Sequence, residues 1–164
     1  MKTYKVAVFV GSLRKESYAR KLAKLFQQLA PSSLVLEIIE IGDLPLYNQD
    51  YDDENQVPAA YRVFRDRVKT MDAFLFITPE YNRTTTPALK NALDVGSRPY
   101  GESVWDGKPG AVVSISPGAL GGFGANHHVR QSLVFLNVAT MQQPEAYVGN
   151  IHKLLTEQGE AIDE

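Results

Sequence analysis

Short apolar segments alternate along this chain with segments that have the period of an amphipathic helix. Residues 6–10 form a continuous apolar run that ends at Gly11, which is typical of a strand buried on both faces of a sheet. Residues 73–78 and 111–116 repeat this pattern, and residues 34–41 and 138–141 are weaker, more polar versions. Helical spacing is found in residues 18–29, 58–71, 86–95 and 129–136, whereas residues 42–57 read as a loop. The alternation predicts an α/β fold with a mainly parallel sheet.

The polar residues within the strands predict their order. The first, third and fourth strands are almost wholly apolar and belong in the centre, while the second and fifth carry polar residues and belong at the edges. The order 2-1-3-4-5 satisfies this and describes a flavodoxin-like, doubly wound, five-stranded parallel sheet with helices on both faces. We expect one domain over residues 1–164. The polar segment 157–164 predicts that the usual last helix, beside the first, is short or missing.

Composition excludes several function classes. Lys and Arg number 17 against 19 Asp and Glu, so a mainly electrostatic nucleic-acid binder is not expected. The absence of cysteine excludes thiolate metal sites and a catalytic thiol, and it suits a reducing compartment. The apolar run at residues 6–10 is shorter than the roughly 7–15 residues of a signal peptide or the about 20 of a membrane span. We therefore expect a soluble, cytoplasmic protein without a membrane partner.

The histidines do not predict a metal site. His127 and His128 are adjacent on an expected helix, where neighbouring side chains point about 100° apart and chelate one ion poorly. Surface positions, or contacts at the mouth of a pocket, fit them better.

Residues 11–17, directly after the first strand, have the chemistry of a phosphate site. In a doubly wound sheet, ligands bind beyond the carboxyl ends of the strands, near the switch between strands one and three. This segment offers the hydroxyls of Ser12 and Ser17, the cations Arg14 and Lys15, and the N–H groups of a helix N-terminus. The alternative is a capped helix start whose charges are only solvated.

Two further segments leave the same edge of the predicted sheet. Residues 79–86 carry many groups able to hydrogen-bond the edge of a heterocycle, and Tyr81 can stack on a ring. Residues 116–124 contain four glycines within seven positions, which lets the backbone approach a flat ligand closely. A polar surface loop and a flexible turn are the respective alternatives. The convergence of three such segments favours a binding site.

These segments resemble the NADPH-dependent FMN reductase family, which includes FMN-containing quinone, azo-dye and chromate reductases. The resemblance covers roughly residues 6–149. It rests most on Gly11-Ser12-Leu13-Arg14 followed by Ser17, and on Pro79-Glu80-Tyr81-Asn82. Residues 89–94, residues 107–109 and the pair Gly121-Gly122 add support.

The resemblance implies a role for each matching segment. Ser12, Arg14 and Ser17 would hold the FMN phosphate. The isoalloxazine would be lined on one side by Pro79, Glu80, Tyr81 and Asn82, with Arg83 at a more variable position, and on the other side by Ser116, Gly118 and Gly121.

The resemblance also implies the reaction. Hydride would pass from NADPH or NADH through the flavin to a small acceptor, such as a quinone, an azo dye, free flavin or a metal oxyanion. Donor and acceptor would use one pocket in turn, in a ping-pong cycle that needs no side-chain nucleophile. Family members are usually homodimers, or homotetramers built from dimers. Residues 88–95 and the loop containing Tyr100 are the expected interface.

Two other functions stay open at this point. A flavodoxin-type electron carrier usually has a strongly acidic face, which the net charge of −2 and the cations of residues 11–17 do not suggest. A non-redox module for a phosphorylated ligand would not need the segment 79–82.

Three side chains have open roles. Glu80 is either a proton participant or a solvated side chain. Trp105 and Tyr100 are expected to be packing residues, with a pocket lid or dimer contact as the alternative.

Overall fold

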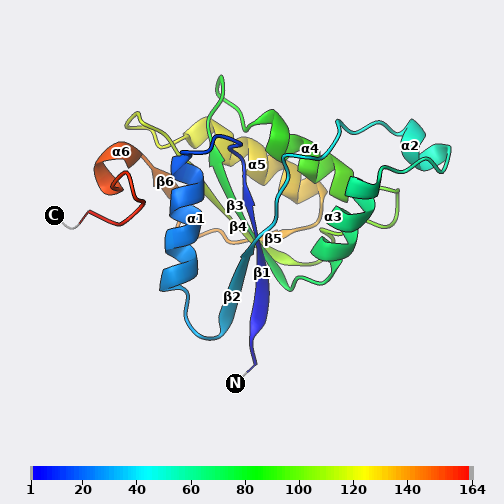
Figure 1. Ribbon diagram of the computed structural model, residues 1–164, viewed down its shortest axis with the longest axis horizontal. Helices are drawn as coiled ribbons and strands as arrows, with labels where there is room; N and C mark the ends of the chain where they lie inside the picture. Colours follow the sequence, from blue (N-terminus) through cyan, green and yellow to red (C-terminus); the bar gives the residue numbers. More distant parts are fainter. Residues whose placement is uncertain (1, 163–164) are drawn as a thin grey trace.

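The computed structural model describes residues 2–162 and contains one parallel sheet with the predicted strand order (Figure 1). The path β2-β1-β3-β4-β5 runs through parallel pairs, and the short strand β6 also pairs with β4. The strands are β1 (Tyr4–Val10), β2 (Leu34–Ile38), β3 (Ala73–Pro79), β4 (Pro109–Ile115), β5 (Ala139–Thr140) and β6 (Ala146–Val148). The predicted flavodoxin-like architecture is confirmed.

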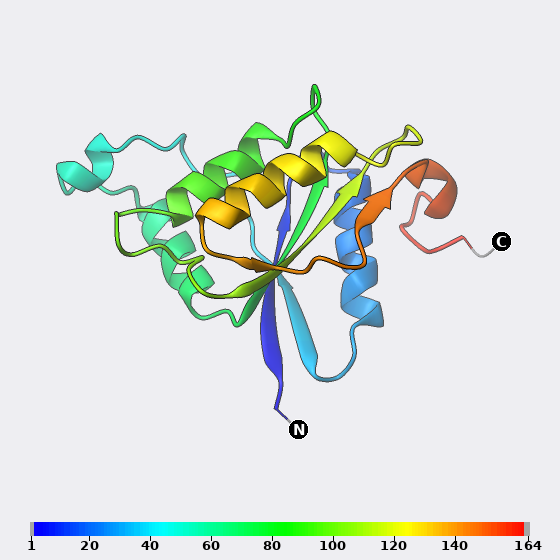
Figure 2. The same cartoon turned by 180° about the vertical axis from the view of Figure 1, so that it is seen from behind.

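Helices cover both faces of the sheet (Figures 1 and 2). One face carries α1 (Tyr18–Leu29) and the four-residue α6 (Ile151–Leu154), and the other carries α3 (Ala59–Lys69), α4 (Pro87–Gly96) and α5 (Phe123–Phe135). Thr86 and Pro87 begin α4 as N-cap and first helical residue, as the sequence predicts. No helix within residues 2–162 combines the length and the apolar character needed to cross a membrane.

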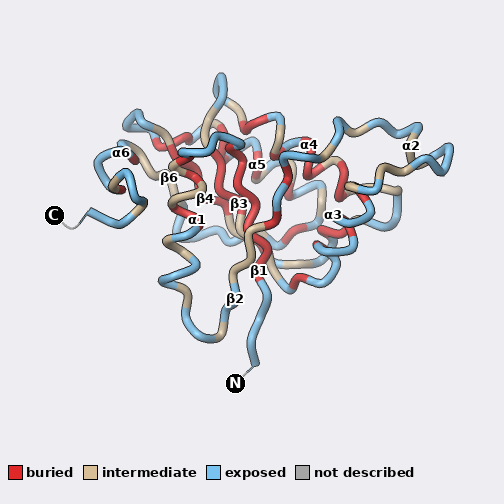
Figure 3. The backbone as a smooth tube through the Cα atoms, in the orientation of Figure 1, coloured by how far each residue is buried: buried red, intermediate tan, exposed pale blue. Residues whose placement is uncertain are grey.

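Buried residues gather in the central strands of the sheet (Figure 3). The part of the core between the sheet and α3 to α5 is centred on aromatic rings. Phe9 and Trp105 are fully buried, with ring centroids 5.2 Å apart in an edge-on arrangement. The Trp105 indole donates a 2.9 Å hydrogen bond to the Leu93 carbonyl, and a side chain at Gly96 would lie 2.6 Å from its ring. Trp105 is therefore a packing residue and not a lid. Tyr100, in contrast, is 90% exposed, so the prediction that it packs in the core is wrong.

Short elements depart from the prediction. β5 has two residues instead of the expected four, and the chain then re-enters the sheet as β6, which pairs with Val113–Ile115. The stretch expected to be a loop, residues 42–57, contains the short helix α2 (Asp50–Asp53). This helix is held by Asp52, whose carboxylate forms a bidentate ion pair with Arg65 at 2.7 and 2.9 Å. Elements of two to four residues leave no periodic pattern to detect.

Candidate functional site

The three predicted segments meet at one edge of the sheet, because β1, β3 and β4 are parallel and end there (Figure 1). We call residues 11–17 loop 1, residues 79–86 loop 2 and residues 116–122 loop 3. Loops 1 and 2 are joined directly: the Thr86 hydroxyl donates to the Gly11 carbonyl at 2.6 Å. A side chain at Gly11 would lie 3.1 Å from the Thr86 hydroxyl and 3.3 Å from Pro79. The close approach of the two loops therefore favours glycine at position 11.

Loop 1 presents two buried hydroxyls at the start of α1. Ser12 and Ser17 are 5% and 3% exposed. Ser17 is the N-cap of α1 and accepts a hydrogen bond from the Arg20 N–H at 3.4 Å, which leaves its own O–H free to donate. The Arg14 guanidinium is exposed and makes no hydrogen bond or ion pair with any residue of the range 2–162. Hydroxyl donors, a free cation and a helix N-terminus together fit a phosphate group.

Loop 2 contains a tight hairpin that projects from the edge of the sheet. Tyr81 and Thr84 exchange backbone hydrogen bonds of 2.9 and 3.0 Å. Asn82 and Arg83 between them have φ values of 50° and 68°, which is the conformation of a type I′ turn. All three residues from Tyr81 to Arg83 are exposed, and Tyr81 is 44% exposed. The hairpin therefore offers an aromatic face and an amide at the open side of the site.

Glu80 points inward, so the interpretation of its side chain as solvated is wrong. The side chain is only 14% exposed. Its Oε2 accepts a 3.1 Å hydrogen bond from the backbone N–H of Ala125, in the first turn of α5, and its Oε1 accepts one of 3.3 Å from Arg83. The carboxylate thus links loop 2 to the helix that follows loop 3.

Loop 3 is held by its own backbone and by β6. The Ser116 hydroxyl accepts from the Gly118 N–H and donates to the Gly118 carbonyl, both at 2.9 Å. Gly121 has φ 59°, and a side chain there would lie 2.4 Å from the backbone of Tyr147. Glycine at position 121 is therefore required by packing against β6, a reason that the sequence did not reveal. Ser116 is half-buried and Gly118 is exposed.

The two adjacent histidines serve different contacts. His127 Nε2 lies 3.0 Å from the Tyr147 hydroxyl, and its ring is 4.3 Å from the Phe123 ring. His128 Nδ1 lies 2.6 Å from the Thr84 hydroxyl. Burial raises the pKa of the Tyr147 hydroxyl, and Glu145 adds to this shift. The contacts of His127 with Tyr147 and of His128 with Thr84 join segments distant in the sequence, and no local pattern could have found them.

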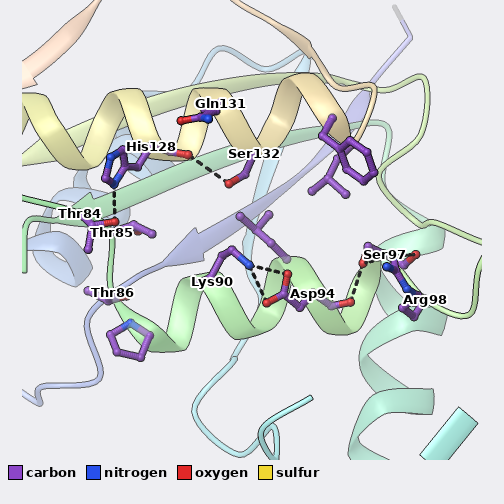
Figure 4. Close-up of a pocket in the computed structure, with 14 residues that line it drawn as sticks. Thr84, Thr85, Thr86, Lys90, Asp94, Ser97, Arg98, His128, Gln131 and Ser132 are labelled. Atoms are coloured by element: carbon purple, nitrogen blue, oxygen red, sulfur yellow. Dashed lines mark hydrogen bonds and ion pairs between the residues drawn. The ribbon is translucent and has the colours of Figure 1, made fainter. Parts of the chain in front are cut away.

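A cavity of about 640 Å³ opens beside loop 2, between α4 and α5 (Figure 4). Thr84–Thr86 line its near end, and Arg98 and Phe135 line its far end. On its α4 side Lys90 pairs with Asp94 at 2.7 Å. Phe135 is 81% exposed, so this cavity is partly walled by an apolar side chain that faces solvent.

Comparisons with known proteins show which family and which solved structures this chain is similar to. A model of the NADPH-dependent FMN reductase family matches residues 4–153. A quinone reductase from Pseudomonas putida is 62% identical over 160 residues, covering 98% of this chain and 86% of the relative. A 2-hydroxy-1,4-benzoquinone reductase from a Burkholderia species is 43% identical, with the same coverage of both chains. The solved structure of FerB, a flavoenzyme NAD(P)H:(acceptor) oxidoreductase from Paracoccus denitrificans, superposes with a TM-score of 0.90 at 41% identity, covering 98% of this chain and 87% of FerB.

Proposed function

We propose a specific role for this chain from one premise: it belongs to the NADPH-dependent FMN reductase family. It is accordingly an FMN-dependent NAD(P)H oxidoreductase with a small-molecule acceptor. We propose that the acceptor is a quinone, because the two similar relatives described above are named as quinone reductases. The observation that carries the proposal is the meeting of three loops at one sheet edge, where loop 2 is hydrogen-bonded to both loop 1 and α5. Buried hydroxyls lie on loop 1 and an exposed aromatic side chain lies on the hairpin of loop 2.

Loop 1 is the proposed phosphate site. Ser12 and Ser17 would donate their hydroxyls, and Arg14 would add the positive charge that no other described residue neutralises. The N-terminus of α1 points its free N–H groups at the same place, and such a terminus favours an anion. These donors match a phosphate monoester, so the residues present fit the cofactor.

Loops 2 and 3 are the proposed ring site. Pro79, Glu80, Tyr81, Asn82 and Arg83 would lie along one side, and Ser116, Gly118 and Gly121 along the other. Because the Glu80 carboxylate is bonded to α5, loop 2 would contact the ring through backbone groups and through the exposed side chains of its hairpin. FMN, when bound, supplies the hydride-transfer chemistry. The protein residues would position the cofactor. Hydride transfer through FMN needs no side-chain nucleophile.

Donor and acceptor would occupy the open side of the site in turn. Tyr81 is 44% exposed on loop 2, and Leu120 is 65% exposed on loop 3. Tyr81 would offer a flat contact and Leu120 an apolar contact, one from each loop, to a nicotinamide or a quinone at the open side of the site. The arrangement supports a ping-pong cycle, which predicts parallel lines in double-reciprocal initial-rate plots of NADPH against quinone.

We further propose a homodimer, or a homotetramer built from two such dimers. The support is a pair of large apolar side chains exposed beside α4: Tyr100 and Phe135. They lie at the cavity between α4 and α5 or in the loop after α4, where the interface is expected. Light scattering coupled to size exclusion tests this, and a single-chain mass would contradict it.

A cytoplasmic location is also proposed, supported by the absence of cysteine.

The visible absorbance of the purified protein tests the function directly. We expect a bound-flavin spectrum after addition of FMN, bleaching when NADPH is added under nitrogen, and recovery of the spectrum when benzoquinone follows. Flavin that binds but stays oxidised would contradict reduction by NADPH and favour an electron carrier. Protein that binds no flavin would remove the proposal. Bleaching without recovery by benzoquinone would overturn the choice of acceptor alone.

A further inference from the structure

We infer that Glu80 is a positioning residue whose carboxylate fixes loop 2 against the N-terminus of α5 and thereby sets the width of the site between loops 2 and 3. The inference rests on the proposed function, since the width matters only if a flat cofactor binds there. It assigns the Glu80 side chain no contact with the cofactor. The carboxylate acts through the backbone that it holds in place.

The first turn of α5 needs a partner from outside the helix. Its N-cap is Gly122, with φ 74° and no side chain, and its first turn, which lies wholly within the described residues, contains no acidic residue. The N–H groups of a first turn have no partner inside the helix. Glu80 reaches across 45 residues of sequence and accepts the Ala125 N–H at 3.1 Å. A carboxylate at this end of a helix is also favoured by the helix dipole.

Loop 2 lies directly on this turn of α5. A side chain at Gly124 would be 2.7 Å from the Arg83 carbonyl and 3.0 Å from Glu80 Oε2. The two segments therefore approach so closely that only glycine fits between them. A second contact, from Thr84 to His128 at 2.6 Å, joins the same hairpin to the next turn of the helix. The hairpin is thus aligned along α5 by contacts at two successive turns.

The bond to Ala125, rather than the ion pair with Arg83, is the contact that positions loop 2. The Arg83 side chain is 77% exposed, and an ion pair at the surface contributes little to the stability of the loop. The Glu80 side chain is mostly buried, and the N–H that it accepts from belongs to a helix packed into the core through Val129 and Leu133. The other end of loop 2 is fixed to loop 1 through Thr86. Loss of the Ala125 bond would leave the hairpin held to α5 by the contact between Thr84 and His128 alone.

Three variants separate acceptor geometry from charge. Glu80→Gln keeps an oxygen at the same reach without the charge, Glu80→Asp keeps the charge with one methylene less, and Glu80→Ala removes both. Glu37→Ala is the matched control, because Glu37 is also a carboxylate paired with an arginine, Arg67, but on β2 away from the loops. The readouts are the FMN dissociation constant of apoprotein by flavin fluorescence quenching, the near-ultraviolet and visible circular dichroism of bound FMN, and hydrogen exchange of the Ala125 amide.

We expect Glu80→Ala and Glu80→Asp to raise the FMN dissociation constant about tenfold or more, the scale of one hydrogen bond to a charged group. Both should change the dichroism of bound FMN and speed exchange at Ala125. Glu80→Gln should stay within about threefold of the unaltered protein. The proposal is overturned if exchange at Ala125 rises while FMN binding is unchanged, if Gln is as impaired as Ala, or if Glu37→Ala has the same effect. Failure of the unaltered protein to bind FMN would instead reject the proposed function, and the exchange readout would still report the contact.

Discussion

The Thr86 side chain joins two loops that are 75 residues apart in the sequence. Its hydroxyl donates to the Gly11 carbonyl at 2.6 Å and accepts from the Leu89 N–H at 3.3 Å. One buried hydroxyl thus caps α4 and fixes the end of β1. The geometry of loop 1 therefore depends on the start of a helix in another part of the chain.

Replacement of Thr86 by Val should lower the free energy of unfolding by about 2–4 kcal/mol, because the helix cap is lost and the buried Gly11 carbonyl is left without its partner. Thr86→Ser keeps the hydroxyl and should cost less than about 1.5 kcal/mol. Urea unfolding of both variants measures the difference. Equal stability of the Val and Ser variants would contradict the dual role of the hydroxyl.

Arg14→Ala should weaken FMN binding by roughly 1.5–3 kcal/mol, the range for a hydrogen bond to a charged group. Its guanidinium is free within residues 2–162, so the fold should keep its stability. Lys24→Ala removes an exposed cation on the far part of α1 and serves as the control. Fluorescence titration of apoprotein with FMN measures both. An unchanged dissociation constant for the Arg14 variant would reject its role at the phosphate.

Asp52→Ala should destabilise the fold by about 3–5 kcal/mol, because it leaves the Arg65 charge buried without its partner. The two side chains are 7% and 8% exposed, and Arg65 also donates to the Val95 carbonyl at 2.9 Å. Glu40→Ala breaks the more exposed pair with Arg20 and should cost at most about 1 kcal/mol. Chemical unfolding ranks the two, and a reversed order would show that the Asp52 pair is not buried in solution.

The pair of Glu40 and Arg20 predicts a pH dependence of stability. The hydrogen bonds from Arg20 hold the pKa of the Glu40 carboxyl below its ordinary value of 4.5. A lowered pKa in the folded state means that the contribution is present above pH 4.5 and is lost as the pH falls through the folded value. The stability difference between the natural protein and Glu40→Gln should therefore shrink in acid. Thermal unfolding from pH 7 to pH 3 measures it, and a constant difference would contradict the pairing.

The central strands were predictable because each is a continuous apolar run, and the polar residues of β2 and β5 placed those two strands outside them. β6 was not predictable. Its three residues become a strand only through pairing with Val113–Ile115, a partner that a local pattern does not reveal. The helix α2 was missed for a similar reason, since its stability depends on the distant Arg65.

The candidate site was predictable as a set of loops but not in its internal contacts. Ser17 was correctly expected near a helix start, because hydroxyl residues favour the N-cap. The direction of the Glu80 side chain was not predictable, since it depends on Gly122 and Gly124 bringing α5 close to loop 2. The residue roles toward FMN stay predictions, and the experiments above test them.

The hydrogen bonds of Thr86, Glu80 and Thr84 join loop 1, loop 2 and α5 in the protein alone. A cofactor that enters therefore meets a preorganised frame, and little backbone freedom is left for it to remove. The entropic penalty of association falls accordingly, and more of the contact energy appears as affinity. The same frame makes the site selective for the shape of its ligand. A ligand of similar charge but greater thickness would have to break hydrogen bonds between the loops before it could bind.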